Sequence, residues 1–167
     1  MLHPDNGNVL INGTDLYSGS RAEISSVRSH NIGFIFQQFH LVPYLSVKEN
    51  IMSPSIAVHV ANLETKAEEL MVEFGLKERE HHRSEQLSTG EKQRTALARA
   101  LITSPSIILA DEPTGNLDDK NSQAVLNSLK KFAEQGGIVM MATHSEKAAS
   151  AADSQLFMEK GKLCGSV

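Results

Sequence analysis

The sequence has little of several things, and each scarcity narrows the protein's class. Cys164 is the single cysteine, so an intramolecular disulfide is impossible and a reducing compartment fits best. Sixteen lysines and arginines against twenty aspartates and glutamates give a formal charge of −4, which leaves no strong basic field for nucleic acid or an anionic membrane. No apolar run approaches the roughly 20 residues of a spanning helix, and no signal-peptide pattern opens the chain. We therefore expect any membrane association to come through a partner.

What is present is the composition of one soluble domain: 167 residues, 40% of them hydrophobic and 22% charged. Three short apolar runs, 32–36, 107–110 and 138–143, each end abruptly in polar residues. Runs without alternation suit parallel strands that are covered on both faces, and ligands of such sheets bind at the carboxyl ends of the strands. We therefore expect an α/β fold in which the residues after these runs converge on one edge: Gln37, Asp111, Glu112 and His144.

Periodicity and turn residues place the other elements. Apolar residues at helical spacing predict amphipathic helices over 63–74 and 125–133, and an alanine-rich stretch predicts another over 148–152. Asn12-Gly13 supplies the positive φ angles of a two-residue hairpin turn, which predicts a hairpin over 9–16. A short strand is expected at 156–158, with a turn at 160–162.

Ser88 begins the first segment that bears on chemistry. Ser88 followed by Glu91 has the form of a capping box, so a helix is expected to begin just after Ser88. The free N–H groups of a helix start that also contains Gly90 form a ready site for phosphate. The alternative is an ordinary capped helix.

Two adjacent carboxylates, Asp111 and Glu112, follow the second apolar run. Such a pair is costly to bury unless a cation or hydrogen-bond donors compensate. One carboxylate could help to hold Mg²⁺ while its neighbour deprotonates an attacking water. The alternative is an exposed acidic turn.

His144 ends the third run, where it could donate a hydrogen bond to phosphate oxygens as charge develops on them. The alternative is a polar surface residue. His81 and His82 lack the spacing of metal ligands, so a solvated loop is preferred there.

Taken in order, these motifs resemble those of one family. Phe36-Gln37, then Leu-Ser-Thr-Gly-Glu at 87–91, then Asp-Glu-Pro-Thr-Gly-Asn-Leu-Asp at 111–118, then Thr143-His144 are similar to the ATP-binding cassette (ABC) ATPases. The segments 31–41 and 110–118 look most like the bacterial branch that serves lipoprotein release, macrolide export and peptide resistance. The resemblance covers essentially the whole chain and implies a P-loop NTPase-like fold, a mostly parallel sheet flanked by helices.

The resemblance implies roles for the matching residues. Gln37 would contact Mg²⁺ and the attacking water, Asp111 would be the Mg²⁺-associated aspartate, and Glu112 would be the catalytic base. His144 would be the switch histidine, and Asp118 the aspartate that crosses the dimer interface. Ser88 and Gly90 match the signature motif, which contacts the γ-phosphate of ATP held by the opposite subunit. ATP and Mg²⁺ are thus the implied cofactors, and in-line attack of water on the γ-phosphate is the implied reaction.

Two departures from the family pattern stand out. Thr89 replaces the first glycine of the signature, and no Gly-x-x-x-x-Gly-Lys-[Ser/Thr] phosphate loop occurs among the 167 residues. We expect a partial domain that begins after the phosphate loop and neither binds nor hydrolyses ATP appreciably alone. In the family the strand before that loop lies between the strand that ends at His144 and the one at 156–158. Its absence is expected to expose edges, leave 156–158 without its partner, and favour low stability or association.

The expected organisation is a core sheet region over 1–37 and 102–167, with an inserted helical subdomain over 38–101. The expected partners are a second ATPase subunit, arranged head to tail, and a transmembrane permease subunit that contacts the apolar loop 41–45. The expected location is cytoplasmic, at the inner face of the cell membrane, with no nucleic-acid partner. One alternative is a non-catalytic module that donates its signature helix to a complete ATPase. Another is the head of a chromosome-maintenance protein, although no sustained heptad pattern is present.

Overall fold

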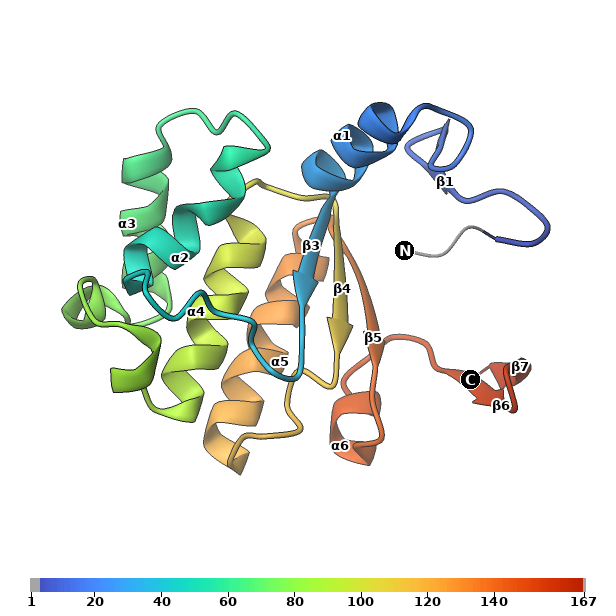
Figure 1. Cartoon of the computed structure of the whole chain (residues 1–167). Coiled ribbons are helices and arrows are strands. Elements are labelled where there is room, and N and C mark those ends of the chain that lie inside the picture. The colour runs from blue at the N-terminus through green and yellow to red at the C-terminus, as the bar shows by residue number, and fades with distance from the viewer. Residues whose placement is uncertain (1–3, 167) are drawn as a thin grey trace.

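A computed structural model describes residues 4–166. Its central element is a parallel sheet of three strands in the order β3-β4-β5, namely Ile32–Ile35, Ile107–Asp111 and Ile138–Ala142 (Figure 1). The register sets Ile32 beside Ile107 and Ile107 beside Ile138. All three predicted strands are confirmed, and because they run in parallel their carboxyl ends share one edge.

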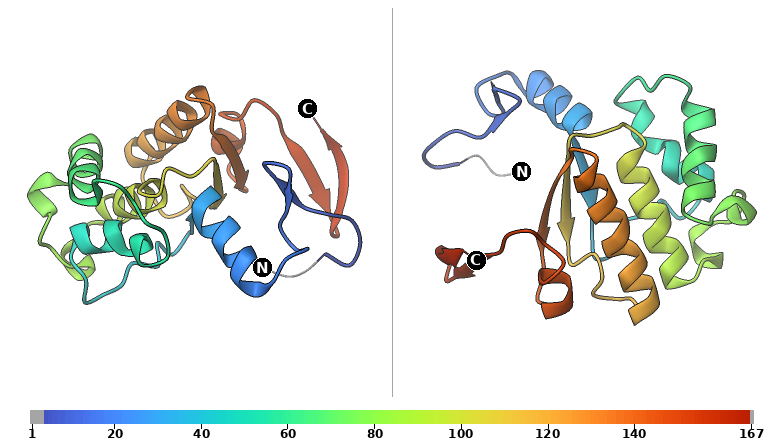
Figure 2. Two further views of the ribbon diagram at one scale, coloured as in Figure 1. Left: turned by 90° about the horizontal axis from the view of Figure 1, so that it is seen from above. Right: turned by 180° about the vertical axis from the view of Figure 1, so that it is seen from behind.

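Two long helices cover one face of this sheet. Helix α4 (Thr89–Leu101) packs on β3, and helix α5 (Asp119–Glu134) packs on β5 (Figures 1 and 2). The main core lies between these layers and includes fully buried Ile35, Leu97 and Ile108. Gly33 lets α4 approach closely, because a Cβ on it would come within 2.6 Å of the Ala100 carbonyl oxygen.

A second helical layer packs outside α4. It consists of α2 (Val47–Met52), the 3₁₀ turn η1 (Ser53–Ile56) and α3 (Leu63–Glu73), followed by two further 3₁₀ turns, η2 (Lys77–Arg79) and η3 (Ser84–Gln86). Helix α3 confirms the periodicity of its apolar residues, since Ala67, Leu70 and Met71 are buried. The division of the chain at 38 and 101 stays a prediction.

The N-terminal residues lie on the opposite face of the sheet. Strands β1 (Leu10–Ile11) and β2 (Thr14–Asp15) pair as the predicted hairpin, with positive φ angles of 50° at Asn12 and 78° at Gly13. Helix α1 (Arg21–Asn31) follows. It was not predicted, although Ser20 and Glu23 form a capping box at its start, and it has no fully buried residue. A small second core joins these elements to the sheet through Ile11, Leu16 and Ile32.

The C-terminal part departs from the sequence predictions in the extent of its helix. Helix α6 spans only Glu146–Ala149, not 148–152, because Ser145 caps it at the earlier position and only Ala148 is buried. A single turn with one buried residue gains too little from packing to extend the helix, however favourable alanine is.

The predicted strand at 156–158 exists as β6 (Leu156–Glu159), and it stands apart from the three-stranded sheet. As expected, β6 has no neighbouring strand in that sheet among the described residues. It pairs antiparallel with β7 (Lys162–Ser166) through the turn that contains Gly161 (Figure 2).

Candidate functional site

Glu112 lies at the carboxyl edge of the sheet, directly after β4, and its carboxylate faces the end of β5. One carboxylate oxygen accepts a hydrogen bond from the Thr143 hydroxyl at 3.0 Å, and the other accepts one from the His144 backbone N–H at 2.6 Å. The predicted cost of burying this carboxylate is thus offset by two donors. Because a carboxylate offers about four lone-pair positions, each oxygen can still accept another hydrogen bond.

The backbone at Glu112 is held in an unusual conformation. Its φ angle is +43°, a left-handed region that costs a non-glycine residue of order 1 kcal/mol or more. Hydrogen bonds on both sides maintain it: the Glu112 N–H donates to the Ala142 carbonyl at 2.9 Å, and its own carbonyl accepts from the Gly115 N–H at 3.1 Å. The turn therefore aims the Glu112 side chain along the sheet edge.

Gln37 reaches the same place from the end of β3. Its amide nitrogen lies 3.4 Å, and the Glu112 Cβ 3.6 Å, from the point where a Cβ on Gly115 would sit. Asn116 donates a hydrogen bond from its side chain to the Gln37 carbonyl at 3.0 Å. Gln37 and Glu112, 75 positions apart in the numbering, thus flank one glycine. Sequence reasoning gave no role to Thr143, Gly115 or Asn116.

Asp111 and His144 complete this edge cluster, which we define as Gln37, Asp111, Glu112 and His144. Asp111 is the last residue of β4 and sits beside Ala142 in register. Both side chains are exposed. Within residues 4–166 neither the Asp111 carboxylate nor the His144 ring has a hydrogen bond or ion pair, so both are free to meet a ligand.

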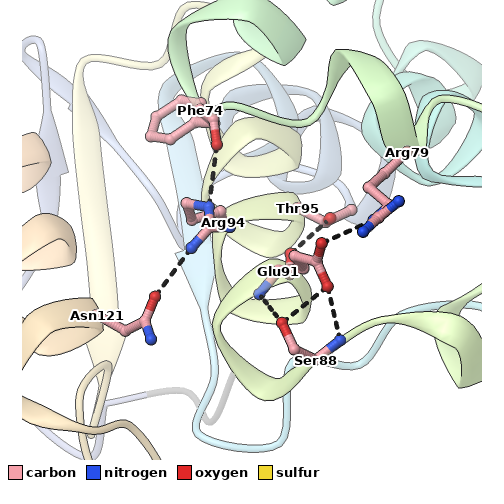
Figure 3. Close-up of polar contacts among 7 residues, drawn as sticks. All are labelled: Phe74, Arg79, Ser88, Glu91, Arg94, Thr95 and Asn121. Carbon is pink, nitrogen blue, oxygen red and sulfur yellow. Dashed lines mark hydrogen bonds and ion pairs between the residues drawn. The ribbon is translucent and has the colours of Figure 1, made fainter.

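Helix α4 begins as the capping box predicts. Ser88 is its N-cap, its hydroxyl accepts from the Glu91 N–H at 3.3 Å, and the Glu91 carboxylate accepts from the Ser88 N–H at 2.8 Å (Figure 3). Arg79 donates to the same carboxylate at 2.8 Å. This charge-assisted bond, with those from Ser88, lowers the pKa of Glu91 from 4.5 to about 2.

Asp118 and Gly90 lie next to the same helix start. Asp118 is the N-cap of α5 and accepts from both the backbone and the side-chain N–H of Asn121, each at 2.8 Å. The two bonds lower the pKa of Asp118. Gly90 is buried against the Asn121 amide. Ser88, Gly90 and Asp118 therefore form a second group, here called the signature cluster.

Gln93 connects the two clusters. It is 1% exposed, and its side-chain amide donates to the Pro113 carbonyl at 2.8 Å. Helix α4 is thereby joined to the residue that follows Glu112. No hydrogen bond among the described residues joins a member of one cluster directly to a member of the other.

Mg²⁺ fits the donor set at the sheet edge in only one of its usual modes. Residues 4–166 contain no group of three His, Cys, Asp or Glu side chains able to cage a metal ion. Mg²⁺ usually takes one or two carboxylates and completes its shell with waters and substrate phosphates. The unpartnered Asp111 carboxylate, beside Glu112, suits that mode.

None of the described helices has both the length and the apolar character that crossing a bilayer requires.

Residues 1–115 match the family described as "ABC transporter". The chain belongs to the ABC ATPase family. The resemblance carried by the motifs is thereby confirmed, and with it membership of a family of ATPases that energise transport.

The chain is similar to relatives from the branch of the family that the motifs indicated. The chain is 42% identical to the lipoprotein-releasing system ATP-binding protein LolD of Shewanella sp. (strain MR-4), over 96% of this chain and 71% of LolD. It is 40% identical to the macrolide export ATP-binding/permease protein MacB of Bdellovibrio bacteriovorus, over 96% of this chain and 25% of MacB.

Solved cassettes of the ABC family have the same fold. A dimer of the ATP-binding cassette MJ0796, in a post-hydrolysis state with ADP and Pi, aligns with 98% of this chain and 74% of its own at a TM-score of 0.88 and 33% identity. A second dimeric structure of MJ0796, described as a bacterial ABC transporter cassette, gives the same TM-score at 34% identity. The predicted α/β architecture is confirmed.

Proposed function

We propose that the edge cluster is the hydrolytic half of an ABC-type ATP site and that the signature cluster serves the ATP of a second subunit. The observation that carries this proposal is the position of Glu112. Its carboxylate is oriented by Thr143 and His144, and its Cβ and the Gln37 amide both border Gly115, so residues from three distant motifs meet at one sheet edge.

Each residue of the edge cluster has a distinct task. ATP with Mg²⁺, when bound, supplies the phosphoryl group and its electrophilic activation. Glu112 accepts the proton of the attacking water, and the Gln37 amide orients that water. Asp111 is the carboxylate ligand of the cation, and the His144 ring donates a hydrogen bond toward the phosphate oxygens.

Ser88, Gly90 and Asp118 act toward the partner subunit. Ser88 and Gly90 stand at the start of α4, where the first-turn N–H groups have no acceptor within the helix and attract phosphate. Asp118, held by Asn121, crosses to the other subunit. The dimeric cassettes of MJ0796 support this arrangement.

The membrane partner is proposed to contact the loop 41–45, which places the chain at the cytoplasmic face of the cell membrane. Tyr44 in this loop is 74% exposed. The loop is nonetheless shaped from inside by buried Asn50, whose side chain bonds to the backbone of Val42, Leu45 and Ser46. A rigid loop with an exposed aromatic residue suits a docking contact.

The test is ATP hydrolysis with and without a phosphate loop. The 167 residues contain no phosphate-loop motif, so the chain alone should show no appreciable magnesium-dependent ATPase activity. Robust activity of the purified chain would refute this part. When the coding sequence is joined in frame to a phosphate-loop segment, activity should appear, and Glu112→Gln should reduce it by at least about 100-fold. Gln123→Ala, an exposed amide on α5, is the matched control and should retain activity.

A second candidate function is a non-catalytic module that donates its signature cluster to a complete ATPase. The fully formed start of α4, in a chain without a phosphate-loop motif, favours it. ATPase activity that arises only when a phosphate-loop-bearing subunit is added, and disappears with Ser88→Arg, would support this function. Activity that is unaffected by Ser88→Arg would contradict it.

A further inference from the structure

Asn121, in the first turn of α5, is the side chain around which the signature cluster is arranged. Its amide nitrogen donates to one Asp118 carboxylate oxygen at 2.8 Å, and its backbone N–H donates to the other at 2.8 Å. Its amide oxygen accepts from the Arg94 guanidinium at 2.9 Å (Figure 3). Both ends of the amide are therefore engaged, so the side chain has one orientation.

The same amide fills the space beside Gly90. A Cβ on Gly90 would lie 2.4 Å from the Asn121 amide oxygen and 2.9 Å from its amide nitrogen. Both distances are shorter than any real carbon contact of this kind. Neither amide atom can easily move away, because Arg94 holds one and Asp118 holds the other. Position 90 must therefore be glycine for the Asn121 amide to keep its place.

Arg94 extends the connection to the outer helical layer. Its Nε donates to the carbonyl of Phe74, the C-cap residue of α3, at 3.0 Å (Figure 3). One arginine on α4 therefore spans from the end of α3 to the start of α5. A shift of α3 relative to α4 would therefore move Arg94, and through it Asn121 and Asp118.

We propose that Asn121 is a positioning residue that fixes the Asp118 carboxylate relative to Gly90 and the start of α4, so that the signature cluster meets a second subunit as one rigid surface. This inference rests on the proposed function of that cluster. Its test requires neither ATP nor a partner, so a failure here is distinguishable from a failure of the proposed ATPase role.

The first test is a double-mutant cycle of Gly90→Ala and Asn121→Ala, read by thermal unfolding of the full chain. Gly90→Ala alone should lower the midpoint by about 3–8 °C, because the new methyl group meets a clamped amide. With Asn121→Ala already present, Gly90→Ala should lower it by less than about 1 °C, since the space is then open and alanine is the better helix former. Equal losses in both backgrounds would overturn the proposal.

The second test reads the Asp118 carboxylate by NMR titration and does not depend on a cooperative melt. Asn121→Ala removes the side-chain donor and leaves the backbone N–H donors of Asn121 and Lys120, so the pKa of Asp118 should rise toward its ordinary value, while the Lys120 charge remains. Asn121→Ser, a milder change, should raise it in the same direction. Gln123→Ala should leave it in place, because the Gln123 amide nitrogen donates to Asn127 and not to Asp118.

The Gly90 amide resonance gives the matching readout on α4. It should shift in both Asn121 variants and stay unchanged in Gln123→Ala. A merely structural Asn121 would alter the melting midpoint without moving the Asp118 titration. That outcome, or an Asp118 pKa unaffected by either Asn121 variant, would refute the positioning role.

Discussion

The start of α4 and the outer face of β5 are built in opposite ways. On α4, Gln93, Thr95 and Leu97 are at most 1% exposed. The Glu91 carboxylate in its first turn bonds to Ser88 and Arg79, and Arg94 in the next turn bonds to Asn121. On β5, Ile138 is 61% and Met140 is 62% exposed, and β4 is the strand's only neighbour in the described sheet. The comparison separates a signature cluster supported within the chain from a sheet face that the described residues leave uncovered.

The largest effect is expected when one large apolar side chain in each region is truncated to alanine. Leu97→Ala should lower the free energy of unfolding by about 3 kcal/mol, because a buried leucine leaves a cavity. Met140→Ala should lower it by less than about 1 kcal/mol, because little of its side chain is removed from water. Urea unfolding followed by circular dichroism measures both, and equal losses would contradict the contrast.

The second prediction concerns acid and the capping box of α4. The pKa of Glu91 is about 2 in the folded chain and 4.5 ordinarily, so its stabilisation is complete above about pH 5 and is lost as the pH falls toward 2. Between pH 7 and pH 3 the loss should amount to about 2 kcal/mol. Glu91→Gln keeps a capping-box acceptor but does not titrate. The difference between wild-type and variant unfolding curves at pH 7 and pH 3 therefore isolates Glu91, and a pH-independent difference would refute the assignment.

The features that the sequence predicted are those set by residues close together in the chain. Local signals succeeded: Ser88 with Glu91 predicted the start of α4, Asn12-Gly13 predicted a hairpin, and apolar runs predicted three parallel strands. Helix α1 was missed although Ser20 with Glu23 forms the same kind of capping box at its start; its apolar residues Ile24 and Val27 are only partly buried, against the small second core.

The candidate site was predictable only as a set of chain positions. Motif order and the parallel sheet predicted that Gln37 and Glu112 would converge. The residues that hold them could not be found this way, because Thr143 and Asn116 act through contacts between distant segments. Such contacts depend on tertiary packing rather than on spacing along the chain.

The third prediction tests whether α4 also supports the segment after Gln37. The Arg99 guanidinium donates to the carbonyls of Phe39 and His40, two residues with positive φ angles of 57° and 46°. Arg99→Ala should lower stability by about 1.5 kcal/mol and raise amide exchange at 38–41 by at least about tenfold. Lysine cannot reach both carbonyls in the same planar geometry, so the stability and amide exchange of Arg99→Lys should lie between those of the wild type and Arg99→Ala. Unchanged exchange at 38–41 would show that the segment keeps its conformation without Arg99.

The smallest effect on stability is expected for a charge on the exposed face of β5, which should instead change the association of the chain. Met140→Lys places a charge on the open face of β5 and should change the free energy of unfolding by less than about 0.5 kcal/mol. Because uncovered apolar strands promote pairing between chains and charges oppose it, the variant should stay monomeric at concentrations where the wild type associates. Light scattering over a concentration series measures this, with Val72→Lys, a change at a 65%-exposed position on α3, as the control. If both lysines suppress association equally, net charge is the cause. If only Met140→Lys does so, the association surface is the face of β5, and the contrast between the two regions extends from stability to assembly.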